Sequence, residues 1–254
     1  MKTSETEFSL IQPALLKNND SIRAWFTRKN GGFSQSDSAI PGLNLGFNTP
    51  DPKEIVARNR LALMDSLGLD QEWVAYADQV HSNRIRLVTQ GGTYPSTDGL
   101  ITEVPGLTLG IQVADCAAVL LWDSEKKIIA ALHAGWRGAA GDIVPRGIEM
   151  MTAQGADAKK IKAFVSPCLS LKDFEVGNEV ANLFPGEYVD YERFAKPHVD
   201  LKRYLRHQME YSGLSEANIE VREECTVAQG HDFYSYRREG KKSGRMMALI
   251  QISD

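Results

Sequence analysis

The sequence has little that would mark a secreted or membrane-bound protein. Only three of its 254 residues are cysteine, and an odd, sparse set of cysteines is a poor disulfide framework in a chain of this length. The opening residues, MKTSETEFSLIQPALL, lack the basic segment and apolar segment that define a signal peptide. No apolar run approaches the roughly 20 residues of a membrane helix. We therefore expect a cytoplasmic protein with no membrane partner.

A strong excess of charge is also missing. The 29 Lys and Arg residues are balanced by 33 Asp and Glu residues, which gives a formal net charge of −4. This balance offers no general electrostatic reason to bind nucleic acid. Internal repeats and low-complexity linkers are absent too, while 43% of the residues are hydrophobic, enough for a sizeable core. We expect one continuous domain over residues 1–254.

Apolar segments and helical patterns alternate along the chain. The helix pattern after Asp51 has that residue as its N-cap and Pro52 at its first position, and it ends at Gly68. The pattern predicts further helices at 141–155, 174–184 and 200–213. It predicts strands at 22–27, 85–88, 107–113, 117–122, 128–132, 162–166, 219–221 and 246–252.

The predicted strands at 107–113, 117–122 and 128–132 are almost continuously apolar. Such runs indicate a sheet that is covered on both faces. The mixture of helices and strands predicts an α/β or α+β domain with helices layered on sheet.

Cys116 and His133 lie at the two ends of a predicted hairpin. If residues 123–126 form the turn and Trp122 faces Lys127, then Cys116 directly faces His133. Residues opposed in this way share one face, with Cβ atoms about 4.5–5.5 Å apart. One thiolate and one imidazole so placed can bind a single ion, preferably zinc and less specifically copper. A shift of the pairing by one residue would separate them.

A catalytic zinc site has three protein ligands and one open position. Among the remaining histidines we favour His81, which lies in the polar stretch QVHSN before a predicted strand. His231, in a polar loop beside a glycine, stays open as an alternative. Spacing alone favours the ordinary alternative, a buried Cys116 and a hydrogen-bonded His133, over a metal site.

Ordered blocks of the sequence resemble the laccase-domain family, also called the multicopper polyphenol oxidase or YfiH family. The core of the resemblance is VADCAAVLLWD followed by ALHAGWRGAA. Further blocks are TRKNGGFS (27–34), LNLGFNTPDPKEIVARNR (43–60), QVHSNRI (79–85), TDGLITEVPGLTLGIQVADC (97–116), FEVGNEV (174–180) and CTVAQGHDFYSYRREGKKSGR (225–245).

The resemblance implies a layered α/β/β/α fold with mixed sheets, similar to the catalytic domain of a cytotoxic necrotizing factor. It implies zinc-dependent phosphorolysis of purine nucleosides (adenosine, inosine or methylthioadenosine) to free base and ribose 1-phosphate, with adenosine deamination as a side activity. The metal ligands that it implies are His81, Cys116 and His133, which are the two residues selected by the hairpin spacing and the histidine favoured by its polar surroundings. The expected partners are thus a purine nucleoside and phosphate.

Phosphorolysis needs a group that holds phosphate, and the guanidinium fork of arginine binds oxyanions in a bidentate manner. Arg137, four residues after His133 in a Gly-flanked turn, is our first candidate, and Arg28 is the second. Asp115 adjoins the cysteine and could orient a ligand or act as acid or base. Polar and aromatic contacts to the substrate are predicted for Asn44, Gln79 and Tyr234.

Three rival functions remain open. Copper-dependent polyphenol oxidation is disfavoured because multicopper oxidases use many more histidines than the five of this chain. A cysteine hydrolase, editing peptidoglycan precursors as some relatives imply, would use Cys116 as nucleophile and His133 as base. A non-enzymatic zinc module would need a fourth ligand such as Cys225 or His231.

One loop departs from the family pattern. The segment SPCLSLKDFEVG (166–177) carries Leu169-Ser170-Leu171 where relatives commonly have a turn similar to Ile-Gly-Pro. No substrate contact of this loop is therefore carried over to the chain, and Cys168 is expected to be structural.

Overall fold

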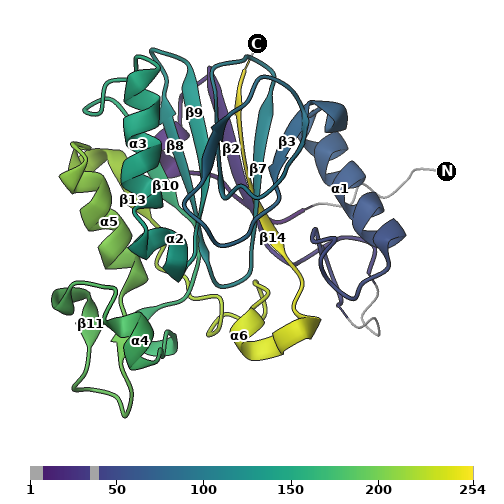
Figure 1. Ribbon diagram of the computed structural model, residues 1–254. Coiled ribbons are helices and arrows are strands. Elements are labelled where there is room, and N and C mark those ends of the chain that lie inside the picture. Colours follow the sequence, from purple (N-terminus) through teal and green to yellow (C-terminus); the bar gives the residue numbers. More distant parts are fainter. Residues whose placement is uncertain (1–7, 35–39, 254) are drawn as a thin grey trace.

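Two six-stranded β-sheets lie face to face in the computed structural model, which describes residues 8–34 and 40–253 (Figure 1). The first sheet has the order β1 (Leu10–Ile11), β2 (Ile22–Thr27), β14 (Met246–Ile252), β7 (Thr108–Val113), β3 (Val74–Ala77), β5 (Gly92–Tyr94). The second has the order β13 (Ile219–Val221), β10 (Lys162–Val165), β8 (Ala117–Asp123), β9 (Ile128–Ala134), β6 (Gly99–Thr102), β4 (Ile85–Leu87). Both sheets contain parallel and antiparallel pairs.

Helices cover the outer face of each sheet. Helix α1 (Lys53–Leu67) packs on the first sheet, and α3 (Ile143–Ala153) and α5 (Leu201–Tyr211) pack on the second beside the short α2 (Trp136–Ala140). The layers are thus α/β/β/α, as predicted. Two more short helices are α4 (Asn178–Ala181) and α6 (Tyr236–Glu239), and 3-10 turns lie at Ala14–Leu16, Gln71–Trp73, Leu171–Asp173, Gly186–Tyr188, Glu216–Asn218 and Gly240–Lys242.

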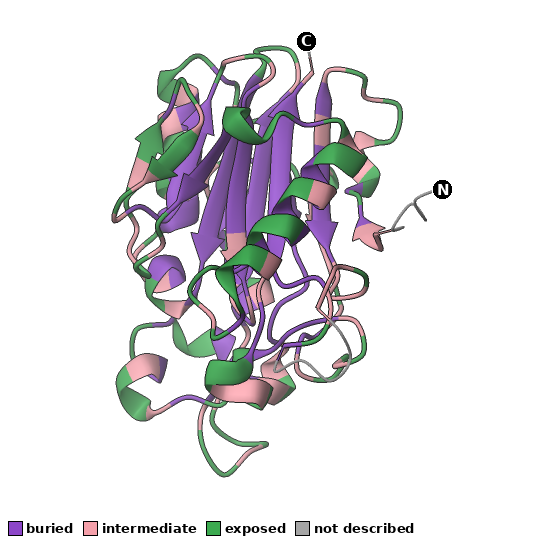
Figure 2. Cartoon of the chain, turned by 90° about the vertical axis from the view of Figure 1, so that its right-hand side faces the viewer, coloured by how far each residue is buried: buried purple, intermediate pink, exposed green. Residues whose placement is uncertain are grey.

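The apolar strands are explained by this layering. Phe26 and Ile111 of the first sheet meet Leu120, Ile129 and Phe164 of the second in a fully buried interface. The same strands also bury their outward residues under the helices, and Figure 2 shows the central strands almost entirely buried, whereas the edge strands β4 and β5 are largely exposed. The sequence predicted that the three apolar runs share one sheet. Instead, β7 lies in the first sheet, and β8 and β9 lie in the second.

Two helix predictions need correction. In the segment 174–184 only α4 is helical, because Val176 and Phe174 exchange backbone hydrogen bonds with Pro197 and Val199 in an extended pairing. This pairing continues the small sheet of β11 (Val189–Asp190) and β12 (His198–Val199). At the other helix, Pro52 rather than Asp51 is the N-cap of α1.

The hairpin of β8 and β9 forms with a register two residues away from the predicted one. His133 pairs with Ala118 instead of Cys116, because Asp123 pairs with Ile128 and a four-residue loop connects the strands. A shift by two residues keeps each side chain on its original face. Cys116, in the bend just before β8, therefore still lies on the same side as His133. No helix within the two described ranges is both long enough and apolar enough to cross a membrane.

Candidate metal centre

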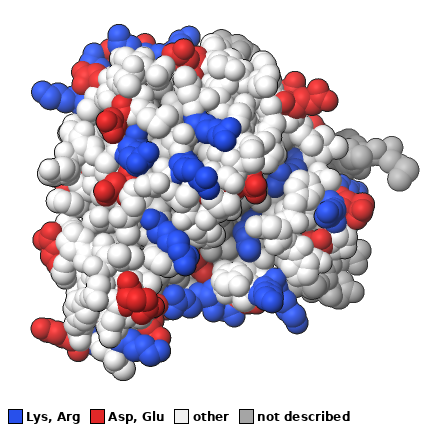
Figure 3. Space-filling view, viewed as in Figure 1, with Lys and Arg blue, Asp and Glu red and all other residues white. Residues whose placement is uncertain are grey.

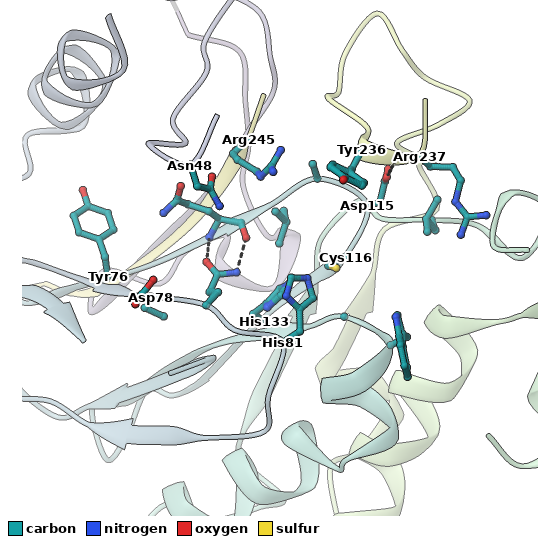
Figure 4. Close-up of a pocket in the computed structure, with 18 of the residues that line it drawn as sticks. Asn48, Tyr76, Asp78, His81, Asp115, Cys116, His133, Tyr236, Arg237 and Arg245 are labelled. Atoms are coloured by element: carbon teal, nitrogen blue, oxygen red, sulfur yellow. Dashed lines mark hydrogen bonds between the residues drawn. The ribbon is translucent and has the colours of Figure 1, made fainter. Parts of the chain in front are cut away.

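Three segments that are far apart in the sequence bring His81, Cys116 and His133 together. His81 lies in the loop between β3 and β4, Cys116 in the bend between β7 and β8, and His133 near the end of β9. Their ligand atoms all lie within 4.8 Å of one another, and the two imidazole rings meet edge to face at 4.8 Å between centroids (Figure 4). The structure thus forms the cluster that the sequence predicted.

A buried carboxylate, Asp98, organises two of these three residues. Its Oδ1 lies 2.8 Å from Nδ1 of His133 and accepts the backbone N–H of His81 at 2.9 Å. Its Oδ2 accepts the backbone N–H and the hydroxyl of Ser82 at 2.7 and 2.6 Å. Because Nδ1 of His133 is engaged by Asp98, Nε2 is the nitrogen left to bind a metal.

These bonds also explain the backbone of His81. Its φ of 59° lies in the left-handed region, which is uncommon for a residue with a side chain. Asp98 fixes this conformation by accepting consecutive backbone N–H groups of the loop. Sequence reasoning missed Asp98, although it belongs to the block TDGLITEVPG, and an acidic residue before a buried strand was the available signal.

Cys116 and His133 form an electrostatically coupled pair. Burial would raise the pKa of the Cys116 thiol, but the charge of His133 and hydrogen bonds from His133 and His81 lower this pKa overall. Burial would lower the pKa of His133, but Cys116 and Asp98 raise it. The pair therefore favours a thiolate, which is the form that binds a metal and the form that acts as a nucleophile.

Gly135 keeps the space beside the cluster open. A Cβ at this position would lie 2.8 Å from Sγ of Cys116 and 3.4 Å from Cδ2 of His81. Any larger residue would push against the side chains that must meet. Steric crowding therefore explains why glycine occupies this position of HAGWRG.

One sulfur and two imidazole nitrogens match the donor preferences of zinc, and also those of copper. Two ligands of a tetrahedral zinc lie about 3.6 Å apart, so ligand atoms that now lie within 4.8 Å of one another would have to draw together to share one ion. The suggested fourth ligands lie elsewhere: Cys225 donates its thiol to Asp173 at 3.1 Å, and the exposed His231 lies beside Asp232. A closed four-ligand zinc module through Cys225 or His231 is therefore not formed by the described residues.

The cluster opens into a cavity of about 650 Å³. We call one part of its wall the polar side; it comes from the region around the first sheet and contains Asn48, Arg60, Asp78, Thr93 and Arg245. The apolar side comes from the helices and loops around the second sheet and contains Trp136, Leu169, Phe174 and Leu201. In Figure 4, Asn48 and Arg245 lie to one side of the three ligands, and Tyr236 and Arg237 lie to the other.

Two of the predicted site residues line this cavity with their polar atoms already engaged. The Gln79 amide exchanges two hydrogen bonds with the backbone of Gln112, at 2.7 and 2.9 Å (Figure 4). The Asp115 carboxylate accepts the Thr226 hydroxyl at 2.7 Å and the backbone N–H of Arg237 at 2.6 Å. Both side chains therefore shape the wall of the cavity.

The remaining four residues that were predicted to contact the substrate or act in catalysis lie outside the cavity wall. Asn44 is fully buried and bonds Thr49 and Asp51, and Tyr234 is buried with its hydroxyl on the carbonyl of Pro41. The guanidinium of Arg28 bonds Ser9, and that of the exposed Arg137 lies over the ring of Trp136. The cavity wall takes its arginines from other positions, namely Arg60, Arg237 and Arg245.

The chain matches the family model described as multi-copper polyphenol oxidoreductase laccase over residues 23–253. The chain therefore belongs to this laccase-domain family.

Curated and solved relatives agree with this membership. The chain is 37% identical to a purine nucleoside phosphorylase of Deinococcus radiodurans, covering 94% of this chain and 93% of that protein. It is 30% identical to adenosine deaminase RL5 of an unknown prokaryotic organism, covering 92% and 95%. The structure of YlmD from Geobacillus stearothermophilus is similar with a TM-score of 0.87 and 28% identity, covering 92% of this chain and 93% of that one.

Proposed function

We propose that this protein is a zinc-dependent purine nucleoside phosphorylase, with His81, Cys116 and His133 as the metal ligands. The observation that carries the proposal is the three-residue cluster at the wall of a cavity that also contains three arginines. The names of relatives over nearly the whole chain support it. The cytoplasmic location expected from the sequence is part of this proposal.

The reaction joins a phosphate oxygen to C1′ of the ribose and breaks the bond between C1′ and the purine. The electron pair of that bond passes to the purine, which takes up a proton, and the products are ribose 1-phosphate and free base. Zinc at the cluster would supply a Lewis acid that withdraws electron density from the group bound to it. The arginines hold the phosphate, and the apolar side excludes water from the reacting atoms.

Electrostatics favour an anionic co-substrate at this site. The chain has a net charge of −4, yet Figure 3 shows basic side chains gathered over the middle of one face. The cavity wall itself carries three arginines against two carboxylates, Asp78 and Asp115, and such a local excess of positive charge attracts anions.

The proposal predicts release of hypoxanthine from inosine only when phosphate is present. We expect stoichiometric ribose 1-phosphate, and a rate that saturates with phosphate concentration, because phosphate is a reactant. Chromatography of both products checks this. Release at the same rate in phosphate-free buffer would show hydrolysis instead and would contradict phosphorolysis.

Adenosine deamination is a second candidate, favoured by the relative named adenosine deaminase RL5. This reaction needs no phosphate and forms inosine rather than adenine. The products formed from adenosine, with and without phosphate, therefore separate the two activities.

Alkylation of Cys116 separates the metal centre from the rival cysteine hydrolase. We expect iodoacetamide to label Cys116 after chelation, because the coupled histidines favour its thiolate, and we expect added zinc to protect it. Peptide mass spectrometry checks the labelled position. Equal labelling of Cys116 with and without zinc would favour the hydrolase.

A further inference from the structure

We infer that Arg60, Arg245 and Asn48, on the polar side of the cavity, form the binding site for a phosphate group. The inference rests on the proposed function for its preferred ligand, inorganic phosphate. It replaces Arg137 and Arg28, which the sequence favoured and which lie outside the cavity wall.

Arg60 is a buried cation without a carboxylate partner. It is only 6% exposed, and no Asp or Glu in the described ranges lies within 4.0 Å of its guanidinium. Its Nε donates to the carbonyl of Leu45 at 2.8 Å, and its guanidinium lies over the rings of Phe47 and Tyr76. This packing holds the guanidinium rigidly, and a buried charge without a partner favours an anionic ligand.

Arg245 is the second cation of this site. One terminal amino group donates to the carbonyls of Ser243 and Gly244 at 2.8 and 2.9 Å. Within the described ranges its Nε and its other amino group make no hydrogen bond, and no carboxylate pairs with it. Burial lowers the pKa of Arg245, and the lowering is opposed by the nearby Cys116. Arg245 lines the same cavity as His81, Cys116 and His133, and its guanidinium adds positive charge there.

The loop at Leu45 and Gly46 contacts both arginines. Leu45 gives its carbonyl to Arg60 and its N–H to the backbone carbonyl of Arg245. A Cβ at Gly46 would lie 2.4 Å from Cγ of Arg245 and 3.1 Å from Oδ1 of Asn48. The loop thus packs directly against Arg245, and it places the exposed amide of Asn48 in the same cavity wall.

The remaining charged group on this side is Asp78. Its carboxylate forms no ion pair with Arg60 or Arg245 and no hydrogen bond within the described ranges. A carboxylate accepts hydrogen bonds but does not donate them. It therefore suits the hydroxyl groups of a ribose next to the phosphate, and the pair of arginines matches the two negative charges of a phosphate.

Calorimetric titration of the metal-containing protein with inorganic phosphate tests this site. We expect Arg245→Gln to bind phosphate about tenfold or more weakly, because a hydrogen bond to a charged group is lost. Asn48→Ala, at an exposed position where folding is not at risk, should weaken binding about threefold to fivefold. The control Arg86→Gln removes an exposed arginine of β4 outside the cavity and should bind as the wild type does.

A parallel titration with adenosine 5′-monophosphate identifies the source of the phosphate group. Binding of inorganic phosphate that is lost in Arg245→Gln supports a site for free phosphate. Binding of the monophosphate alone, lost in the same variant, supports the site but contradicts phosphorolysis. Unchanged binding in both Arg245→Gln and Asn48→Ala, or a loss seen only in Arg137→Gln, would overturn the inference even if the enzyme is a phosphorylase.

Discussion

Replacing Cys116 with alanine is expected to remove the bound metal and to lower phosphorolysis by about 100-fold or more. Cys116 supplies the sulfur of the three-residue cluster, whereas loss of a group that only supports a metal ligand typically costs 10–100-fold. Loss of a ligand itself should exceed that range. Metal analysis and inosine turnover on the same preparation measure both effects.

Cys168→Ala is the matched control for this substitution. Cys168 is a buried free cysteine, and the one hydrogen bond of its Sγ within the described ranges is donated to the carbonyl of Leu169 at 3.6 Å. This variant should keep its metal and its activity. A Cys116→Ala protein that retains one metal ion and full activity would show that the metal lies elsewhere.

Replacing Asp98 with asparagine is expected to weaken metal binding by about 10–100-fold. Asp98 holds Nδ1 of His133 at 2.8 Å and also fixes the loop of His81. Its pKa is kept low, to about 2, because hydrogen bonds from His133 and Ser82 outweigh the effect of burial. Asparagine removes the negative charge and turns one acceptor into a donor, so His133 loses its orientation.

Competition with a zinc-binding dye measures this effect. Ser82→Ala is the control, because it removes only the hydroxyl that donates to Asp98 and leaves the contact with His133 in place. We expect a change of about tenfold at most there, because a single hydrogen bond to the charged carboxylate is lost while Asp98 keeps its charge and its contact with His133. Equal metal affinities of Asp98→Asn and wild type would show that the carboxylate does not support the ligands.

The candidate metal centre could be predicted because it depends on the local pattern of one hairpin. The predicted register was wrong by two residues, and the prediction survived because side chains in a strand alternate with a period of two. His81 followed from its polar surroundings and from the family resemblance. Asp98 could not be found in this way, because its role depends on the pairing of β6 with β9.

The proposed phosphate contacts were also hard to predict, because they depend on how distant parts of the chain pack together. Arg60 and Arg245 are separated by most of the chain, and both line one cavity beside the loop at Leu45, which bonds the side chain of Arg60 and the backbone of Arg245. Nearness to His133 in sequence favours Arg137, but its guanidinium lies over the ring of Trp136 and does not line the cavity. Asn44 and Tyr234 lie in the resembling blocks, yet they are buried and bond Asp51 and the carbonyl of Pro41.

Zinc titration of the chelated wild-type protein tests the central claim most directly. Inosine and phosphate are present throughout, and hypoxanthine release is followed as zinc is added. If His81, Cys116 and His133 hold the zinc that phosphorolysis requires, activity rises linearly from near zero and levels off at one equivalent. Full activity before any zinc is added, or no activity at any zinc concentration, would contradict it.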